Sequence, residues 1–320
     1  MKTESLNEKL IKAAREKIPG GVNLASVLMD MLYIGKEAVY RRLRGEVPFT
    51  FTEASLISNA LGISLDRISA SDSTGNALFG LNIIDHKRPV ETYGSLIEHD
   101  ISVINAVKKN PALEWYAAFN SIPQMFYLNH DNLARFFLYK WMYQHEKINY
   151  IRYFSELTFA DDLRGKQREY VKASKEVASA NFIWDNMMFY SLVNDIKYFM
   201  DINLVNRDEA EALKEEIHQL INELEQLAAK GCHKPGKSIR IYLSDINFEA
   251  SYGYLEADDF KVSVLRLYAI NEIATADRKV FELQKEWIHS LKKYSTLISV
   301  SGEKRRIQFF EKQRRHVDSL

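Results

Sequence analysis

Apolar side chains recur at helical spacing through the first seventy residues of the chain. Ser5 with Glu8 has the spacing of a capping box, in which each residue hydrogen-bonds the other's backbone at a helix start, and Thr50 with Glu53 repeats it. Apolar positions follow each pair three or four residues apart, as they do on the buried face of a helix. The pattern predicts five short helices within residues 5–68.

A change of pattern marks the rest of the chain. The first residues of the segment 69–90 are rich in Ser, Asp and Gly, which predicts a linker. Helical periodicity with many aromatic residues then predicts long helices at about 92–108, 112–121, 131–146, 150–160, 165–180, 182–202 and 207–230. Alternation with a period of two predicts a small antiparallel sheet of two or three strands near 239–270, and two helices close the chain at about 277–294 and 303–317.

We therefore expect a mainly α fold with four parts. These are a helical head at 1–68, a linker at 69–90, a helical dimerisation or sensor body at 91–230, and a small α+β part at 231–320 packed on the body.

Composition limits the class of protein. The 320 residues are 46% hydrophobic, and 43 Lys and Arg residues balance 43 Asp and Glu residues, so any nucleic-acid site must be local. A single cysteine, Cys232, excludes a disulfide framework. We see no secretory signal pattern and no apolar run of membrane-spanning length, and so expect a cytoplasmic protein without a membrane contact.

The head carries an ordered set of features between Leu24 and Ile68. An apolar helix is followed by a tight turn at Ile34-Gly35, a short helix 36–44 around Val39, a stop at Arg44-Gly45-Glu46 and the tail 57–66. This set resembles the lambda-repressor-like (Xre-type) helix-turn-helix family over the first fifth of the chain. The resemblance implies that helix 36–44 is a recognition helix for the DNA major groove, with Lys36 near its point of entry.

The residue types in this helix agree with that role. Val39 and Leu43, four residues apart, face inward with Ala38, which leaves a basic and hydrogen-bonding outer face. Arg42 and Arg44 are expected to hold phosphates, and the start of the next helix offers hydroxyls and backbone N–H groups. The candidate DNA-binding residues are Lys36, Glu37, Tyr40, Arg41, Arg42, Arg44, Thr50 and Thr52.

Three positions depart from the family pattern. Met29 stands where a small residue is usual, Arg42 where an apolar one is usual, and Leu43 where a polar one is usual. The angle at which helix 36–44 crosses the preceding helix, and its rotation about its own axis, are therefore left open. The first seventy residues hold 10 basic and 8 acidic side chains, a net charge of only +2. Such a weakly basic head needs a second copy for useful affinity, which predicts a homodimer on double-stranded DNA.

Three segments of the remainder leave alternatives open. The leucine-rich seam from Leu213 to Leu227 is either an ordinary core-facing helix or a dimerisation seam. The apolar segment 182–200 is either plain core or the wall of a pocket for a small-molecule or peptide effector, with Trp184, Asp185, Asn194 and Asp195 as candidate residues. The basic stretch 295–320 is either a docked helix with a solvated face or an anion site.

Motifs of enzyme chemistry are missing from the sequence. It has no GxGxxG, P-loop, HExxH or paired CxxC pattern, so we expect no catalytic residues, no cofactor and no metal. The leading hypothesis is a sequence-specific, dimeric transcriptional regulator. The alternative is a protein–protein interaction module with a degenerate helix-turn-helix head, and an enzymatic body is a third hypothesis.

Overall fold

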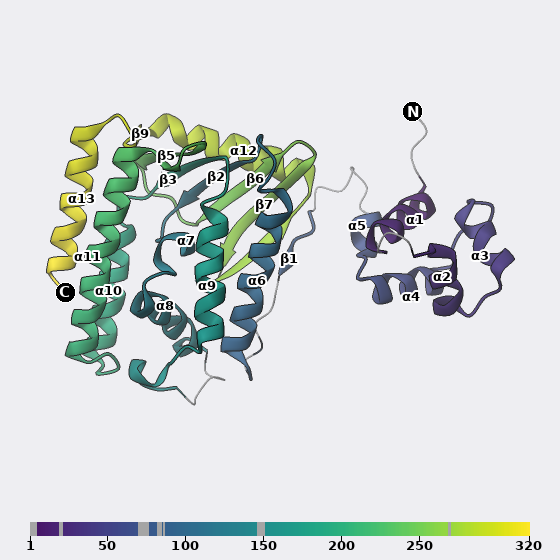
Figure 1. Ribbon diagram of the computed structural model, residues 1–320, viewed down its shortest axis with the longest axis horizontal. Coiled ribbons are helices and arrows are strands. Elements are labelled where there is room, and N and C mark those ends of the chain that lie inside the picture. Colours follow the sequence, from purple (N-terminus) through teal and green to yellow (C-terminus); the bar gives the residue numbers. More distant parts are fainter. Residues whose placement is uncertain are drawn as a thin grey trace. The chain divides into compact units, whose positions relative to one another are not determined.

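The chain forms two compact units, residues 1–78 and 79–320, which are described in turn (Figure 1). The computed structural model describes residues 5–18, 22–69, 77–81, 85, 87–145, 151–267 and 270–320. Residues 70–76, 82–84 and 86 of the predicted linker lie outside the described residues.

Five helices make up the first unit as the structure describes it. They are α1 (Leu6–Lys17), α2 (Leu24–Leu32), α3 (Lys36–Leu43), α4 (Phe51–Leu61) and α5 (Leu65–Ser69). Both predicted capping boxes, at Ser5 and at Thr50, are formed, and Gly62 ends α4 in the left-handed conformation. The buried side chains of this unit are Leu10, Ile11, Ala14, Ala25, Leu28, Leu32, Val39, Ile57 and Ile63.

The second unit contains one mixed sheet, of nine strands in its described residues. The strands are β1 (Gly80–Leu81), β2 (Glu114–Phe119), β3 (Ser179–Trp184), β4 (Cys232–Lys234), β5 (Lys237–Ser244), β6 (Tyr252–Ala257), β7 (Phe260–Leu267), β8 (Asn271–Thr275) and β9 (Ser295–Leu297). Their order is β1-β8-β7-β6-β2-β3-β5-β4, and β9 pairs with β5. The β2–β3 and β3–β5 pairs are parallel, and the others are antiparallel.

The expected mainly α fold with a small sheet is wrong, because this unit is an α/β fold. The centre of the sheet is β2 and β3. β2 lies inside the segment 112–121, which was predicted to be helical, and β3 spans the end of predicted helix 165–180 and the start of predicted helix 182–202. Consecutive residues are buried in both strands, 117–119 in β2 and 180–184 in β3, so neither strand shows the alternation that marks a strand with one solvent face. The predicted helix 150–160 is, in its described part, a 3₁₀ turn at Phe154–Glu156 (η1).

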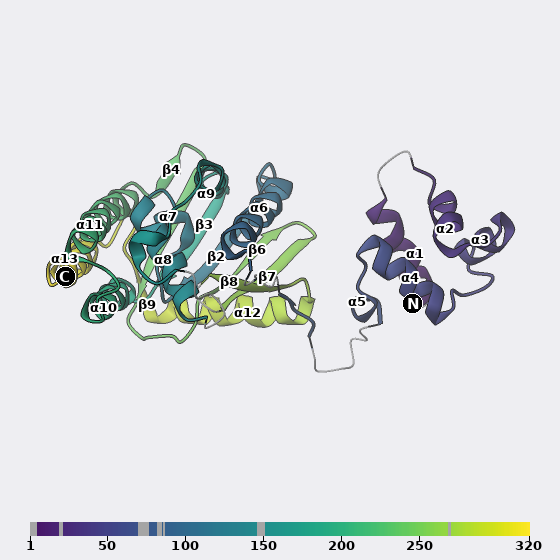
Figure 2. The same ribbon diagram turned by 90° about the horizontal axis from the view of Figure 1, so that it is seen from below.

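Helices cover both faces of this sheet (Figure 2). The structure describes α6 (Pro89–Val107), α7 (Gln124–Tyr127), α8 (Asp131–Tyr143), α9 (Asp161–Ser174), α10 (Met188–Asp201), α11 (Arg207–Lys230), α12 (Arg278–Leu291), the 3₁₀ turn η2 (Lys292–Tyr294) and α13 (Glu303–Asp318). Helix α12 lies alone along one face, where Phe281 and Ile288 meet Ala118, Ile183 and Tyr254 of the sheet. The larger core lies on the opposite face.

The leucine seam of α11 belongs to this larger core. Leu213, Ile217, Leu220 and Leu224 are all buried, and α11 packs on α8, α10 and α13. The structure thus supports the interpretation of an ordinary core-facing helix. The seam is covered inside the unit and is closed to a second copy.

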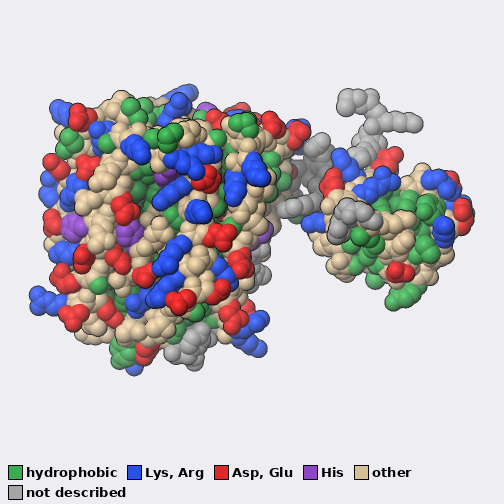
Figure 3. Space-filling view, in the orientation of Figure 1, with side chains coloured by type: hydrophobic (Ala, Val, Ile, Leu, Met, Phe, Trp, Pro, Cys, Tyr) green, Lys and Arg blue, Asp and Glu red, His purple; other side chains and the backbone are tan. Residues whose placement is uncertain are grey.

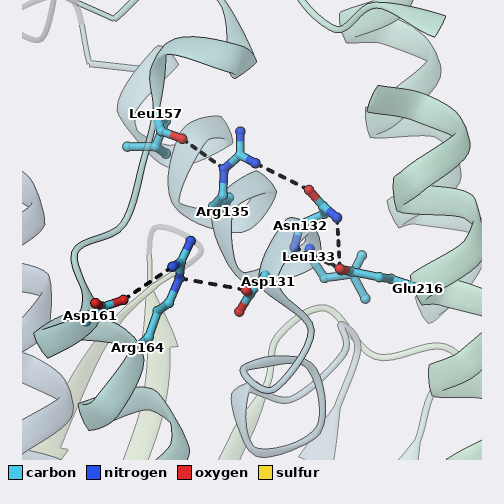
Figure 4. A network of polar contacts seen from close by, with 8 residues as sticks. All are labelled: Asp131, Asn132, Leu133, Arg135, Leu157, Asp161, Arg164 and Glu216. Atoms are coloured by element: carbon cyan, nitrogen blue, oxygen red, sulfur yellow. Dashed lines mark hydrogen bonds and ion pairs between the residues drawn. The ribbon is translucent and has the colours of Figure 1, made fainter. Parts of the chain in front are cut away.

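A polar network fixes α8 against its neighbours (Figure 4). The Glu216 carboxylate of α11 accepts hydrogen bonds from the backbone N–H groups of Asn132 at 3.1 Å and Leu133 at 2.8 Å, in the first turn of α8. From α8, Arg135 donates to the carbonyls of Leu157 at 2.8 Å and Phe154 at 3.1 Å. A carboxylate at a helix N-terminus accepts from backbone N–H groups that have no partner within the helix, and its negative charge is stabilised by the positive end of the helix dipole. The network therefore has a structural role.

Candidate nucleic-acid interface

A three-residue turn, residues 33–35, connects α2 to α3. The Asn23 side chain caps α2 by accepting a hydrogen bond from the Ala25 amide at 2.9 Å. The helix ends at Tyr33, whose φ of 53° lies in the left-handed region and whose surface is 93% exposed. Gly35 then begins α3 without a side-chain cap. The chain therefore reverses direction sharply, and α3 packs on α2.

One fully buried side chain holds α3 to the core of the unit. Val39 has no exposed surface and shares an apolar cluster with residues of α1, α2 and α4. Leu43 is partly buried against the same cluster, as the sequence predicts. Tyr40, predicted on the outer face, is also partly buried there, and its ring centre lies 6.0 Å from the Lys36 ammonium.

The outer face of α3 carries exposed charges of both signs. Arg44 is paired with Glu46 at 2.6 Å and with Glu37 at 3.3 Å, and Arg41 lies 3.5 Å from Glu46. The Arg44 guanidinium holds the pKa of the Glu46 carboxyl below its ordinary value. Both arginine side chains are about half exposed, at 53% and 50%. Exposed pairs of this kind contribute little free energy, so a phosphate or a base edge can replace the carboxylates.

Arg42 does not share this outer face. Its guanidinium forms two hydrogen bonds with Glu53 of α4, Nε to Oε2 at 3.0 Å and Nη2 to Oε1 at 2.8 Å. Nη1 also donates to the Ala38 carbonyl at 3.2 Å, and only 16% of the Arg42 side chain is exposed. Burial alone would raise the pKa of the Glu53 carboxyl, but Arg42 and the Thr50 amide outweigh it, so this pKa lies below its ordinary value.

Glu53 also belongs to the cap of α4, so one carboxylate joins two helices. It accepts from the Thr50 amide at 2.8 Å, while the Thr50 hydroxyl accepts from the Glu53 amide at 3.2 Å. Asn7 of α1 fixes the segment between α3 and α4 by accepting from the Phe49 amide at 2.9 Å. The N-terminus of α4 is thereby held in place, with Thr52 exposed in its first turn.

Two exposed aromatic residues near α3 were not among the sequence candidates. Tyr33 stands in the turn before α3, and Phe51, 84% exposed, is the first residue of α4. Its position directly before the Ile34-Gly35 turn is the sequence feature that could have identified Tyr33 as a candidate. Both rings therefore add exposed apolar and stacking surface to the first unit.

The four predicted effector-pocket residues of the second unit do not come together. Trp184, at the end of β3, is fully buried among Phe126, Phe309 and Phe310. Asp185 is also buried, and its carboxylate accepts from the Met187 amide at 2.7 Å.

The other two candidates, Asn194 and Asp195, lie further along α10. Asn194 is exposed, and Asp195 forms an ion pair with Lys140 of α8. The aromatic rings around Trp184 pack as core. Asn194 and Asp195 belong to the outer surface of the unit.

Comparison of the chain with protein-family models, with curated proteins and with solved structures finds no match. In the part of the chain that the structure describes, no helix has the length and apolar character needed to cross a membrane. The described residues also contain no group of three or more His, Cys, Asp or Glu side chains placed to hold a metal ion.

Proposed function

We propose that the first unit binds double-stranded DNA with α3 in the major groove, and that the protein is a cytoplasmic, dimeric transcriptional regulator. The observation that carries this proposal is the geometry of α3. A short helix follows a three-residue turn, is anchored by the buried Val39, and presents Lys36, Arg41 and Arg44 outward. This is the arrangement by which helix-turn-helix proteins insert a helix into the groove.

The outer face suits base recognition in its chemistry. Arginine binds the guanine edge with two parallel hydrogen bonds, and a glutamate accepts from the cytosine amino group. Arg41, Arg44 and the 80% exposed Glu37 supply both kinds of group on one face. In the free protein these charges satisfy one another through Glu46, and DNA exchanges those weak pairs for its own groups.

Phosphate contacts come from the start of α4. Its first backbone N–H groups and the exposed Thr52 form a helix N-terminus of the kind that binds phosphate oxygens. Arg42 has a positioning role in this proposal, since its pair with Glu53 sets the place of α4 relative to α3.

A homodimer follows from the low charge of the head. A net charge of +2 on the first seventy residues gives one head few phosphate contacts, so two heads are needed for tight binding. Two heads in adjacent major grooves read half-sites about 34 Å apart, one turn of DNA. The interface between copies does not use the α11 seam, which is buried within the unit.

Selection of bound duplexes from a random DNA library by the full chain tests the proposal. We expect enrichment of a two-fold symmetric motif with half-sites about 10 base pairs apart. Sedimentation of the protein with the selected duplex should give two chains per duplex. Recovery of no common motif after repeated rounds would contradict the proposal.

A protein partner for the head is the second candidate function. The observation in its favour is that Tyr33 and Phe51 are exposed, while Arg41 and Arg44 are already paired with carboxylates. Salt separates the two functions. Affinity for DNA falls steeply between 50 and 200 mM salt, by about a factor of ten for each few phosphates contacted, whereas an apolar protein contact changes little.

A further inference from the structure

A cavity of about 460 Å³ opens in the second unit at the carboxyl ends of β3 and β5. Its wall combines residues that follow these strands with one side of α13. The lining residues are Asn186, Met187, Leu243, Asn247, Arg305, Gln308, Phe309, Lys312 and Arg315. Both the volume and the location, outside the carboxyl ends of parallel strands, are usual for small-molecule sites.

Residues that do not line the cavity fix the position of α13 beside it. Arg306 is buried and donates to the carbonyls of Ile298 at 2.9 Å and Ser301 at 3.3 Å. On the next turns, Gln313 donates to the Asn186 carbonyl at 3.3 Å and Arg314 pairs with Glu225 of α11. The helix start is equally constrained, because a Cβ on Gly302 would lie 2.1 Å from the Leu297 carbonyl oxygen.

The cations inside the cavity differ from these anchoring residues. Arg305 is balanced by Asp245 at 2.7 Å. Lys312 and Arg315 have no acidic partner among the described residues, and no acidic side chain lines the cavity. The site therefore carries two uncompensated positive charges.

We propose that this cavity binds a small molecule bearing a phosphate monoester, with the phosphate held by Lys312 and Arg315. The charge of a phosphate monoester near neutral pH, about −1.5 to −2, matches the two free cations. An arginine binds two phosphate oxygens at once, and a lysine adds a point charge. Asn247 and Gln308 offer amide groups to a polar remainder of the ligand, and Met187 and Phe309 form an apolar wall.

The test is ligand binding by the full chain, with glucose 6-phosphate as the probe and glucose as the uncharged analogue. Heat of binding and the thermal unfolding midpoint are measured at constant ionic strength. We expect glucose 6-phosphate to bind and raise the midpoint, and glucose to do neither. Lys312→Gln with Arg315→Gln should weaken binding by about tenfold or more, since each lost contact is a charge-assisted hydrogen bond.

A second basic surface supplies a matched control. On the face seen in Figure 3, Lys and Arg side chains gather over α6 and α9, where Arg168 and Lys172 line a separate cleft. Arg168→Gln with Lys172→Gln removes the same two charge types and should leave binding unchanged. Both double variants should keep the wild-type unfolding midpoint without ligand.

Equal binding by the wild type and the Lys312/Arg315 variant would overturn the proposal, as would equal loss in both double variants. Absence of any binding by the wild type to glucose 6-phosphate and to inorganic phosphate would also overturn it. These measurements contain no DNA, so they are independent of the proposed function of the head.

Discussion

The guanidinium of Arg42 and the carboxylate of Glu53 form a two-point ion pair that joins α3 to the start of α4. Both side chains are largely buried, at 16% and 14% exposure. A buried charge that loses its partner destabilises the folded state far more than an exposed one does. Arg42 therefore positions α3, whereas Arg41 and Arg44 lie on the outer surface of this helix.

Replacement of Arg42 by Met should destabilise the first unit by about 1–3 kcal/mol, because Glu53 is left buried without its partner. Hydrogen exchange of the α3 and α4 amides measures this, since all four tryptophans lie in the second unit. Arg41→Met is the matched control, as the Arg41 side chain is 53% exposed. The α3 and α4 amides of Arg41→Met should exchange as they do in the wild type. Equal protection in both variants would contradict a structural role for Arg42.

Glu46 competes with DNA for the arginines of the outer face. Glu46→Gln removes the carboxylate that faces both Arg41 and Arg44. We expect its affinity for the selected duplex to rise about two- to fivefold, since exposed pairs contribute about 0.2–1 kcal/mol. Fluorescence anisotropy of labelled DNA gives this ratio. A lower affinity would show that Glu46 supports the interface and does not oppose it.

Tyr33 combines a left-handed backbone with 93% exposure. Asparagine tolerates this conformation better, so Tyr33→Asn should leave the stability of the first unit unchanged or raise it by up to about 1 kcal/mol. If the ring contacts DNA, the same variant binds the selected duplex more weakly. Unchanged affinity together with higher stability would remove Tyr33 from the interface.

His233, in β4, gives a pH dependence to the second unit. Burial, with Lys175 and Lys230 nearby, lowers its pKa from 6.5 to about 4. The native protein therefore keeps this imidazole neutral while the unfolded chain takes up a proton below pH 6.5. Stability should fall as the pH decreases from 6.5 to 4 and be unaffected by this group above 6.5.

The size of this effect is on the order of 1–2 kcal/mol, since one pKa unit equals about 1.4 kcal/mol and partial exposure reduces it. Urea unfolding followed by tryptophan fluorescence measures it across this range. His233→Gln should show a flatter profile than the wild type. Parallel profiles would assign the pH dependence to other groups.

The sequence predicts elements whose signals are local. The capping boxes at Ser5 and Thr50 depend on residues three apart, and the helices they begin are present. The strands β2 and β3 were predicted as helices because six residues with consecutive buried positions have no periodicity that separates a strand from a core helix. Their pairing joins segments more than sixty residues apart.

The candidate sites, too, could be predicted from the sequence only where their signals are local. The outward position of Arg41 and Arg44 depends on helical spacing from Val39, which is local. The partner of Arg42 depends on how α3 crosses α4, which spacing does not give. Likewise, the predicted pocket residue Asp185 directly precedes two residues that line the cavity. The cations opposite them come from α13, more than a hundred residues later.

The most direct test of the central claim is the affinity of the full chain for its selected duplex when the outer face of α3 is removed. Arg41→Ala with Arg44→Ala should lower the affinity for DNA by about tenfold or more, because each arginine contact contributes about 1–3 kcal/mol. The free energy of unfolding of the double variant should equal that of the wild type. Arg168→Gln with Lys172→Gln, which removes two charges from the second unit, should bind as the wild type does. Wild-type affinity in the Arg41/Arg44 variant would contradict the assignment of α3 as the recognition helix.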